Sequence, residues 1–171
     1  MKSHELFREM PASLAAEVFT FLNEHEKPVY KAAIQGLANQ RNLRAVFVER
    51  KPRDERHAWM KAALSRPISD TLATHLVQAW LLGANKPMLN DFLDALQIAH
   101  EEDGTVEVIP PSPPKEKLQA AVDQLVTKYN PQAVAVYLHA FRDMDSSVQW
   151  PALNEILSDD ARLQLSGVAT G

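Results

Sequence analysis

The chain has 171 residues, of which 46% are hydrophobic and 23% charged, with a net charge of −4 and no cysteine. This length and composition suit one globular domain or two small ones, and without cysteine the chain can form no disulfide, thiolate zinc site or cysteine nucleophile. The acidic balance argues against a dedicated nucleic-acid binder, and the longest apolar run is far shorter than the ~20 residues of a membrane span. The polar N-terminus predicts no secretory signal, so we expect a cytoplasmic location.

The first predicted helices form a pair separated by a proline. Apolar residues recur at helical spacing from Leu14 to about Glu24, which predicts a helix. Pro28 is then suited to the first turn of a second helix, which is expected to reach Leu37. Gly36 inside this helix costs about 1 kcal/mol relative to alanine, and a close contact with another helix would explain it.

A basic segment, Gln40 to Arg66, follows this pair. It contains eight basic and three acidic residues and carries +5, which leaves −9 for the rest of the chain. Ala45 to Val48 is apolar and partly β-branched, and it predicts either the end of a helix or a short extended piece. Another helix is expected from Arg53 to Leu64, with Pro67 stopping it.

The stretch from Val77 to Leu96 predicts a helix, a tight turn and a second helix. Ser69 or Asp70 is expected to cap the first of these helices, which Gly83 would end. Asn85-Lys86-Pro87 is expected to open the second.

The last third of the chain begins with a predicted strand and a linker. Thr105 to Ile109 alternates apolar and polar residues, as short strands do, and Pro110 to Pro114 has the composition of a semi-rigid linker. The small residues 166–171 predict a disordered tail. Three further helices are expected, from Lys115 to Tyr129, from Asn130 through Phe141, and from Ser146 or Ser147 to about Leu157.

Three predicted hairpins resemble one another. A shift of 59 positions places Val18–Leu37 on Val77–Leu96, a further shift of 61 reaches Leu138–Leu157, and four positions are apolar in every copy. We therefore predict an all-α protein of about eight helices, built from about two and a half copies of a hairpin repeat of about 60 residues and stacked as a compact bundle or short solenoid. The predicted organisation is a single domain over 1–165, or lobes 1–109 and 115–165 joined by the proline linker.

The basic segment holds the main candidate for a binding site. Arginine forks suit carboxylates and phosphates, and Trp59 beside them could stack on a base. The competing interpretation is a solvated face on which Glu49, Asp54 and Glu55 pair with the arginines, with Trp59 in the core. The residues that we predict to bind a partner are Arg41, Arg44, Arg50, Lys51, Arg53 and Arg56.

The sequence contains no recognisable catalytic or metal-binding motif. Its five glycines are too scattered for a phosphate loop, and it has neither GxSxG nor HExxH. The densest metal-like clusters are His100 to Asp103 and Glu24 to Glu26, which are more typical of solvated turns because adjacent helical residues diverge. We predict no catalytic residue, metal or cofactor. His75 and His139 are expected to be partly buried, and Trp59, Trp80 and Trp150 to belong to the core.

Repeated hairpins without a catalytic constellation favour a non-enzymatic interaction or scaffold module. Its residues 41–66 would bind an acidic protein partner. Nucleic-acid binding through the same segment is the first alternative. The second is a small-molecule-binding protein or metal-dependent enzyme of helical-bundle type, which needs His75, His100 and His139 to share a cleft. Homodimerisation through an exposed end of the stack is a further hypothesis, and the sequence does not identify the partner.

Overall fold

The computed structural model describes residues 1–143 and 149–166. Every regular element within these ranges is helical, with ten α-helices and two short 3₁₀ helices. The predicted all-α class is confirmed, and the count of about eight helices was too low by two. The predicted start of a helix at Ser146 or Ser147 and the tail beyond Ser166 lie outside the described residues.

The backbone forms two compact units, built on Met1–Gly83 and on Ala84–Leu165. The boundary therefore falls next to Gly83, where we had expected only the end of a helix. The segment Pro110–Pro114 lies inside the second unit, so the lobes 1–109 and 115–165 are not the units that form. None of the helices in the described part of the chain has both the length and the apolarity to cross a membrane.

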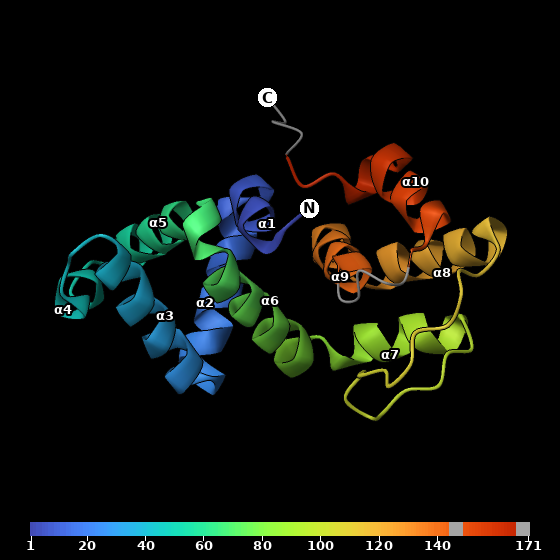
Figure 1. Ribbon diagram of the computed structural model, residues 1–171, viewed down its shortest axis with the longest axis horizontal. Coiled ribbons are helices and arrows are strands. Elements are labelled where there is room, and N and C mark those ends of the chain that lie inside the picture. Colours follow the sequence, from blue (N-terminus) through green and yellow to red (C-terminus); the bar gives the residue numbers. More distant parts are fainter. Residues whose placement is uncertain (144–148, 167–171) are drawn as a thin grey trace. The chain divides into compact units, whose positions relative to one another are not determined.

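The first unit consists of six α-helices and one 3₁₀ helix (Figure 1). Helices α2 and α3 pack side by side as the predicted hairpin, and α5 packs on both α1 and α2. The elements are α1 (Ser3–Glu9), α2 (Ala12–His25), α3 (Lys27–Gln40), α4 (Ala45–Glu49), α5 (Arg53–Leu64), η1 (Pro67–Ser69) and α6 (Asp70–Ala84).

The core of this unit follows from the helical spacing of its apolar residues. Phe7 of α1 stacks on Phe19 of α2 with ring centroids 5.8 Å apart. Gly36 explains how closely α3 approaches α6, because a Cβ atom there would lie 2.9 Å from Leu72 Cδ1. The predicted reason for this glycine is therefore confirmed. His4 fixes α1 to the start of α6, with its Nδ1 2.8 Å from Asp70 Oδ1.

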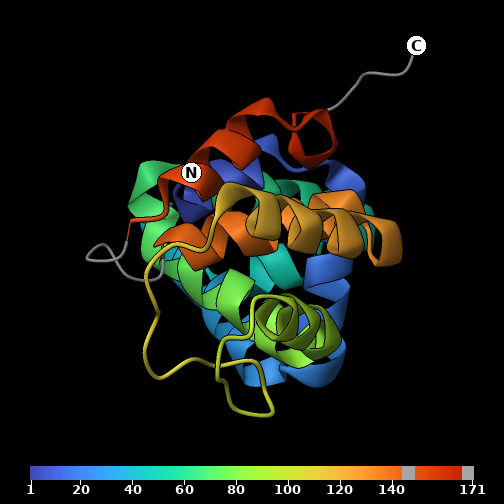
Figure 2. The ribbon, with the colours of Figure 1, turned by 90° about the vertical axis from the view of Figure 1, so that its right-hand side faces the viewer.

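The second unit contains four α-helices, one 3₁₀ helix and a long connection (Figure 2). Rings from α7, α9 and the start of α10 form its core: Phe92 lies edge-on to Tyr137, and Phe141 lies between Phe92 and Trp150. The elements are α7 (Lys86–Ala95), α8 (Lys115–Lys128), α9 (Pro131–Asp143), α10 (Pro151–Asp159) and η2 (Ala161–Leu163).

The connection between α7 and α8 is irregular. The strand predicted over Thr105 to Ile109 is wrong, because alternation alone cannot form a ladder and the described residues offer no partner strand. A turn forms before it, in which the backbone N–H of Glu101 donates to the Thr105 carbonyl at 2.9 Å. Trp150 Nε1 donates to the Pro110 carbonyl at 3.0 Å, which ties the proline segment to the helical part of this unit.

The sixty-residue repeat is not confirmed. Helices α2 and α3 pack together, as do α9 and α10, but α6 and α7 of the middle copy fall on opposite sides of the unit boundary. The segments that follow the first two hairpins also differ, because Ala45–Glu49 is helical whereas 106–109 is not. The four positions that are apolar in all three predicted hairpins are explained by burial alone, since every residue at these positions except Phe21 is buried.

Candidate functional site

The α4 helix and its flanks form the part of the basic segment that is most open to solvent. The chain leaves α3 through Asn42, whose φ of 55° lies in the left-handed region that asparagine tolerates. Five residues of helix follow before Pro52 ends the segment and α5 begins. A helix this short buries only Val48 of its apolar residues, so its other apolar side chains face solvent.

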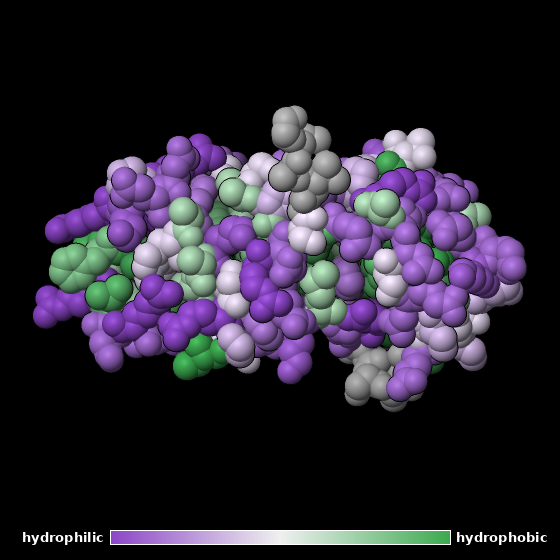
Figure 3. All heavy atoms as spheres, turned by 90° about the horizontal axis from the view of Figure 1, so that it is seen from above, coloured by the Kyte–Doolittle hydropathy of each residue, from purple (hydrophilic) through white to green (hydrophobic). Residues whose placement is uncertain are grey.

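Two of these side chains, together with Leu43 just before α4, are exposed. Leu43 is 40% exposed, Val46 is 37% exposed and Phe47 is 59% exposed. Val46 and Phe47 are neighbours within α4 and Leu43 lies two residues before this helix, so the three exposed side chains belong to one short segment. Figure 3 shows hydrophobic residues among hydrophilic ones at the α4 end of the first unit. An exposed apolar group rimmed by charge is a common feature of interaction surfaces.

Half of the predicted binding residues have structural contacts. Arg53 Nη2 donates to Thr20 Oγ1 at 2.7 Å. Arg56 is half-buried, and its Nε donates to the Tyr30 hydroxyl at 2.8 Å while Nη1 reaches two backbone carbonyls. The Arg41 guanidinium carbon lies 5.5 Å from the centroid of the Trp59 ring. These arginines hold α5 and the end of α3 in place.

The other half is available for a partner. Within the described residues, the side chains of Arg44, Arg50 and Lys51 form no hydrogen bond or ion pair. Arg44 and Arg50 flank α4 directly and are exposed. Arg50 lies three and four positions after Phe47 and Val46, which places it beside the apolar group. We call Leu43, Arg44, Val46, Phe47, Arg50 and Lys51 the α4 patch.

The expected internal neutralisation of the basic segment is not observed. Glu49, Asp54 and Glu55 are exposed, and none of them lies within ion-pair distance of an arginine or lysine in the described part of the chain. Trp59 is half-buried, not fully buried as predicted. The interpretation of the segment as a self-paired charged face is therefore wrong.

A buried histidine is influenced by the positive charge of this region. His57 of α5 is buried, with its ring 5.4 Å from that of Phe19. Burial lowers its pKa, and the nearby charges of Arg56 and Arg53 lower it further. The negative charge of Asp54 acts in the opposite direction, so burial is the main reason why the pKa of His57 is lowered.

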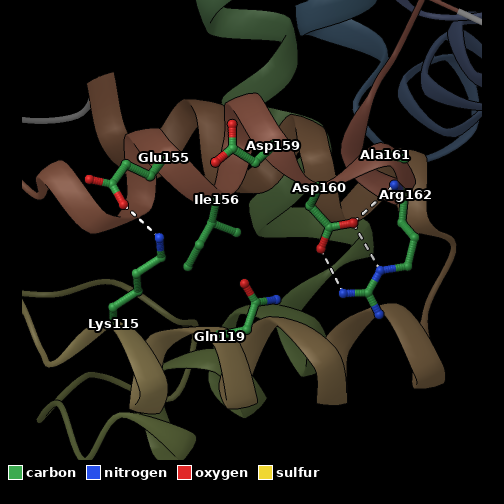
Figure 4. Close-up of a pocket in the computed structure, with 8 residues that line it drawn as sticks. All are labelled: Lys115, Gln119, Glu155, Ile156, Asp159, Asp160, Ala161 and Arg162. Carbon is green, nitrogen blue, oxygen red and sulfur yellow. Dashed lines mark hydrogen bonds and ion pairs between the residues drawn. The ribbon is translucent and has the colours of Figure 1, made fainter.

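A second charged surface lies in the other unit, where a hollow of about 290 Å³ opens between α8, α10 and η2 (Figure 4). Lys115 Nζ lies 2.6 Å from Glu155 Oε2. Arg162 binds Asp160 and Asp123, each at 2.6 Å, and its hydrogen bonds lower the pKa of both carboxyls. The cations of this hollow are thus already paired.

The three histidines are divided between the units: His75 belongs to the first, and His100 and His139 belong to the second. His75 is exposed on α6, which contradicts its predicted partial burial, whereas His139 is buried on α9 as expected. His100 lies beyond the end of α7, where hydrogen bonds from its ring to Asp94 and to the Glu101 carbonyl raise its pKa. No group of three or more His, Asp or Glu residues in the described ranges is arranged to hold a metal ion. Trp80 and Trp150 are buried, as predicted for the core.

Comparison of the chain with protein-family models, with curated proteins and with solved structures finds no match of any of the three kinds. The functional argument therefore depends on the geometry of the residues themselves.

The sequence reasoning identified the basic residues of the α4 patch but not its apolar centre. Val46 and Phe47 were considered only as parts of a helix end or extended piece, and Leu43 was not singled out. The closeness of these three apolar residues, in a segment confined between Asn42 and Pro52, was the signal available. A helix so short has one face against α3 and leaves the opposite face without cover.

Proposed function

We propose that the chain is a protein-interaction module that binds an acidic protein partner through the α4 patch. The observation that carries this proposal is the exposed apolar group around Phe47, flanked by Arg44 and Arg50, two cations that have no partner among the described residues. Such a surface has both components of a binding site: an apolar centre to desolvate and a charged rim to orient the partner.

The free cations favour an acidic partner. A partner's carboxylates would meet Arg44, Arg50 and Lys51 without first breaking an internal ion pair, so the attraction is not offset by a lost contact within the chain. Burying an exposed phenylalanine such as Phe47 contributes roughly 1.5 to 3 kcal/mol. The charged rim would raise the association rate and orient the partner, and the apolar centre would lower the dissociation rate.

The test compares two variants that remove the same charge from different places. The patch variant carries Arg44→Ser, Arg50→Ser and Lys51→Ser. The control variant carries Lys27→Ser, Lys31→Ser and Lys86→Ser, which are exposed lysines far from α4 in sequence. Each tagged protein is used for affinity purification from the native host with nuclease present, followed by mass spectrometry.

The proposal predicts that wild type and control retain the same acidic protein and that the patch variant loses it. Added salt should weaken retention, because exposed charges are screened over about 8 Å at physiological ionic strength. Equal recovery with all three proteins would overturn the proposal. Recovery that disappears on nuclease treatment would replace it with nucleic-acid binding through the same cations, with the steep salt dependence of phosphate contacts.

A further inference from the structure

We infer that one partner of the α4 patch is a second copy of this chain, which docks through the loop between α7 and α8. This inference rests on the proposed function and names an occupant for the same surface. The two units have opposite charges: residues 1–83 contain 12 basic and nine acidic residues, for +3, and residues 84–165 contain six basic and 13 acidic residues, for −7. Copies of the chain therefore attract when unlike units approach each other.

The loop carries negative charge and an exposed apolar side chain, which complement the positive charge and apolar side chains of the α4 patch. Glu101, Glu102 and Glu107 are exposed, and their carboxylates form no ion pair within the described residues. Val108 follows them and is 77% exposed, the highest value among the large hydrophobic side chains of the described chain. The loop thus combines free carboxylates with an exposed apolar group, as the patch combines free cations with one.

Internal hydrogen bonds hold the first part of the loop, from Glu101 to Thr105, in a defined shape. Asp103 Oδ1 accepts from both the backbone N–H and the hydroxyl of Thr105, at 2.9 and 2.7 Å. Asn90 Nδ2 donates to the Glu102 carbonyl at 3.0 Å. None of these bonds uses the side chains of the free glutamates. A loop ordered before contact loses less conformational entropy on docking than a disordered one.

The contact would be heterologous, because the patch and the loop are different surfaces. Such contacts join copies head to tail and produce chains or rings that grow with concentration. Each copy would keep one free patch and one free loop at the ends of an open chain. Growth into larger assemblies therefore requires both surfaces and should stop when either one is altered.

The test uses two variants with reversed charge. The reversed-patch variant carries Arg44→Glu, Arg50→Glu and Lys51→Glu, and the reversed-loop variant carries Glu101→Lys, Glu102→Lys and Glu107→Lys. Molar mass is measured by light scattering over a range of protein concentrations, and circular dichroism checks that each variant is folded. The wild-type mass should rise with concentration, while each variant alone should remain monomeric.

An equimolar mixture of the two variants should associate again. The intact patch of the reversed-loop variant can bind the intact loop of the reversed-patch variant, and the reversed loop and reversed patch are also of opposite charge. Phe47→Ser in the wild type should weaken self-association by about tenfold, through loss of apolar burial. A wild type that stays monomeric throughout, or a mixture that does not pair, would overturn the inference.

The outcome separates this inference from the proposed function. The reversed-loop variant should still retain any other acidic protein in the affinity purification, because its patch is unchanged. If the wild type is monomeric but the patch variant loses such a protein, the second copy is excluded and the proposed function stands. If the patch substitutions affect neither readout, both fail.

Discussion

The α4 patch and the hollow between α8 and α10 are both rich in charge, but their charges are arranged differently. In the hollow, Lys115 and Arg162 are paired with carboxylates at 2.6 Å. In the patch, Arg44 and Arg50 are exposed, and no acceptor lies within reach among the described residues. Paired charges already contribute to the fold, whereas unpaired ones beside an apolar surface are available to another molecule.

The same distinction divides the basic segment itself. Arg56 contacts a tyrosine hydroxyl and two carbonyls, whereas the side chain of Arg50, six positions earlier, has no such contact among the described residues. Equal charge and near proximity in sequence therefore do not imply equal roles. The predictions below test this division through the free energy of unfolding, from the largest expected effect to the smallest.

Replacing an anchored arginine should have the largest effect. Arg56→Ala removes the hydrogen bond to Tyr30, leaves two carbonyls without this donor, and should lower the free energy of unfolding by about 2 kcal/mol. Urea denaturation measures the change, with Arg50→Ala as the matched control, for which the expected change is within about 0.5 kcal/mol. Equal destabilisation by the two substitutions would contradict the division into anchored and free arginines.

The paired cation of the hollow should contribute less. Arg162→Ala removes two ion pairs, but its side chain is 46% exposed, and solvent screens such pairs. The expected loss is about 0.5 to 1 kcal/mol, and it should shrink as salt is added. A loss as large as that of Arg56→Ala would mean that the hollow is a structural centre and not a screened surface network.

Two histidines should give the two units opposite responses to acid. The pKa of His57 is lowered by burial and by nearby arginines, so the unfolded chain binds its proton more readily. Its contribution is favourable above pH about 6.5 and is lost as pH falls below that value. The pKa of His100 is raised by its hydrogen bonds to Asp94 and Glu101, so its contribution is present below pH about 6.5 and is lost as pH rises through the raised value.

The measurement is the free energy of unfolding on either side of pH 6.5, the ordinary histidine value, and above the range where carboxylates titrate. His57→Gln should reduce the loss of stability in acid, and His100→Gln should increase it. The sign of the difference is the test. Changes in the same direction for both variants would show that burial at His57 or pairing at His100 has been misassigned.

The smallest effect on stability is expected from the patch itself. The triple substitution of Arg44, Arg50 and Lys51 by serine removes no side-chain hydrogen bond or ion pair within the described residues and should change the free energy of unfolding by no more than about 0.5 kcal/mol. Thermal unfolding of this variant beside wild type provides the check. A marked loss of stability would mean that these cations belong to the fold, and the case for a binding surface would weaken.

Local patterns were sufficient for most of the fold. The helix over Arg53–Leu64 was predicted with its observed bounds, because apolar spacing and flanking prolines are encoded within the segment. Gly36 was also interpreted correctly, since glycine inside a helix usually signals close approach. The division at Gly83 was not predictable, because it depends on which helices pack together and not on any local signal.

Only the basic residues of the α4 patch could be predicted from the sequence, because the remaining features depend on which helices pack together. The basic residues were evident from composition, but the anchoring of Arg53 and Arg56 depends on Thr20 and Tyr30, which are distant in sequence. The exposure of Phe47 depends on how little of α4 the neighbouring helices cover. The strand predicted near Val108 failed because strands need partners, and partners are set by tertiary structure.

The most direct test of the central claim is arginine-specific chemical labelling with phenylglyoxal, quantified for each residue by mass spectrometry. It is performed on dilute protein and again on protein that is concentrated or bound to a recovered acidic partner. The account predicts fast labelling of Arg44 and Arg50 in dilute protein, protection of both on association, and slow labelling of Arg56 in every state. Unchanged labelling of Arg44 and Arg50 on association would contradict the claim that the α4 patch is a binding surface.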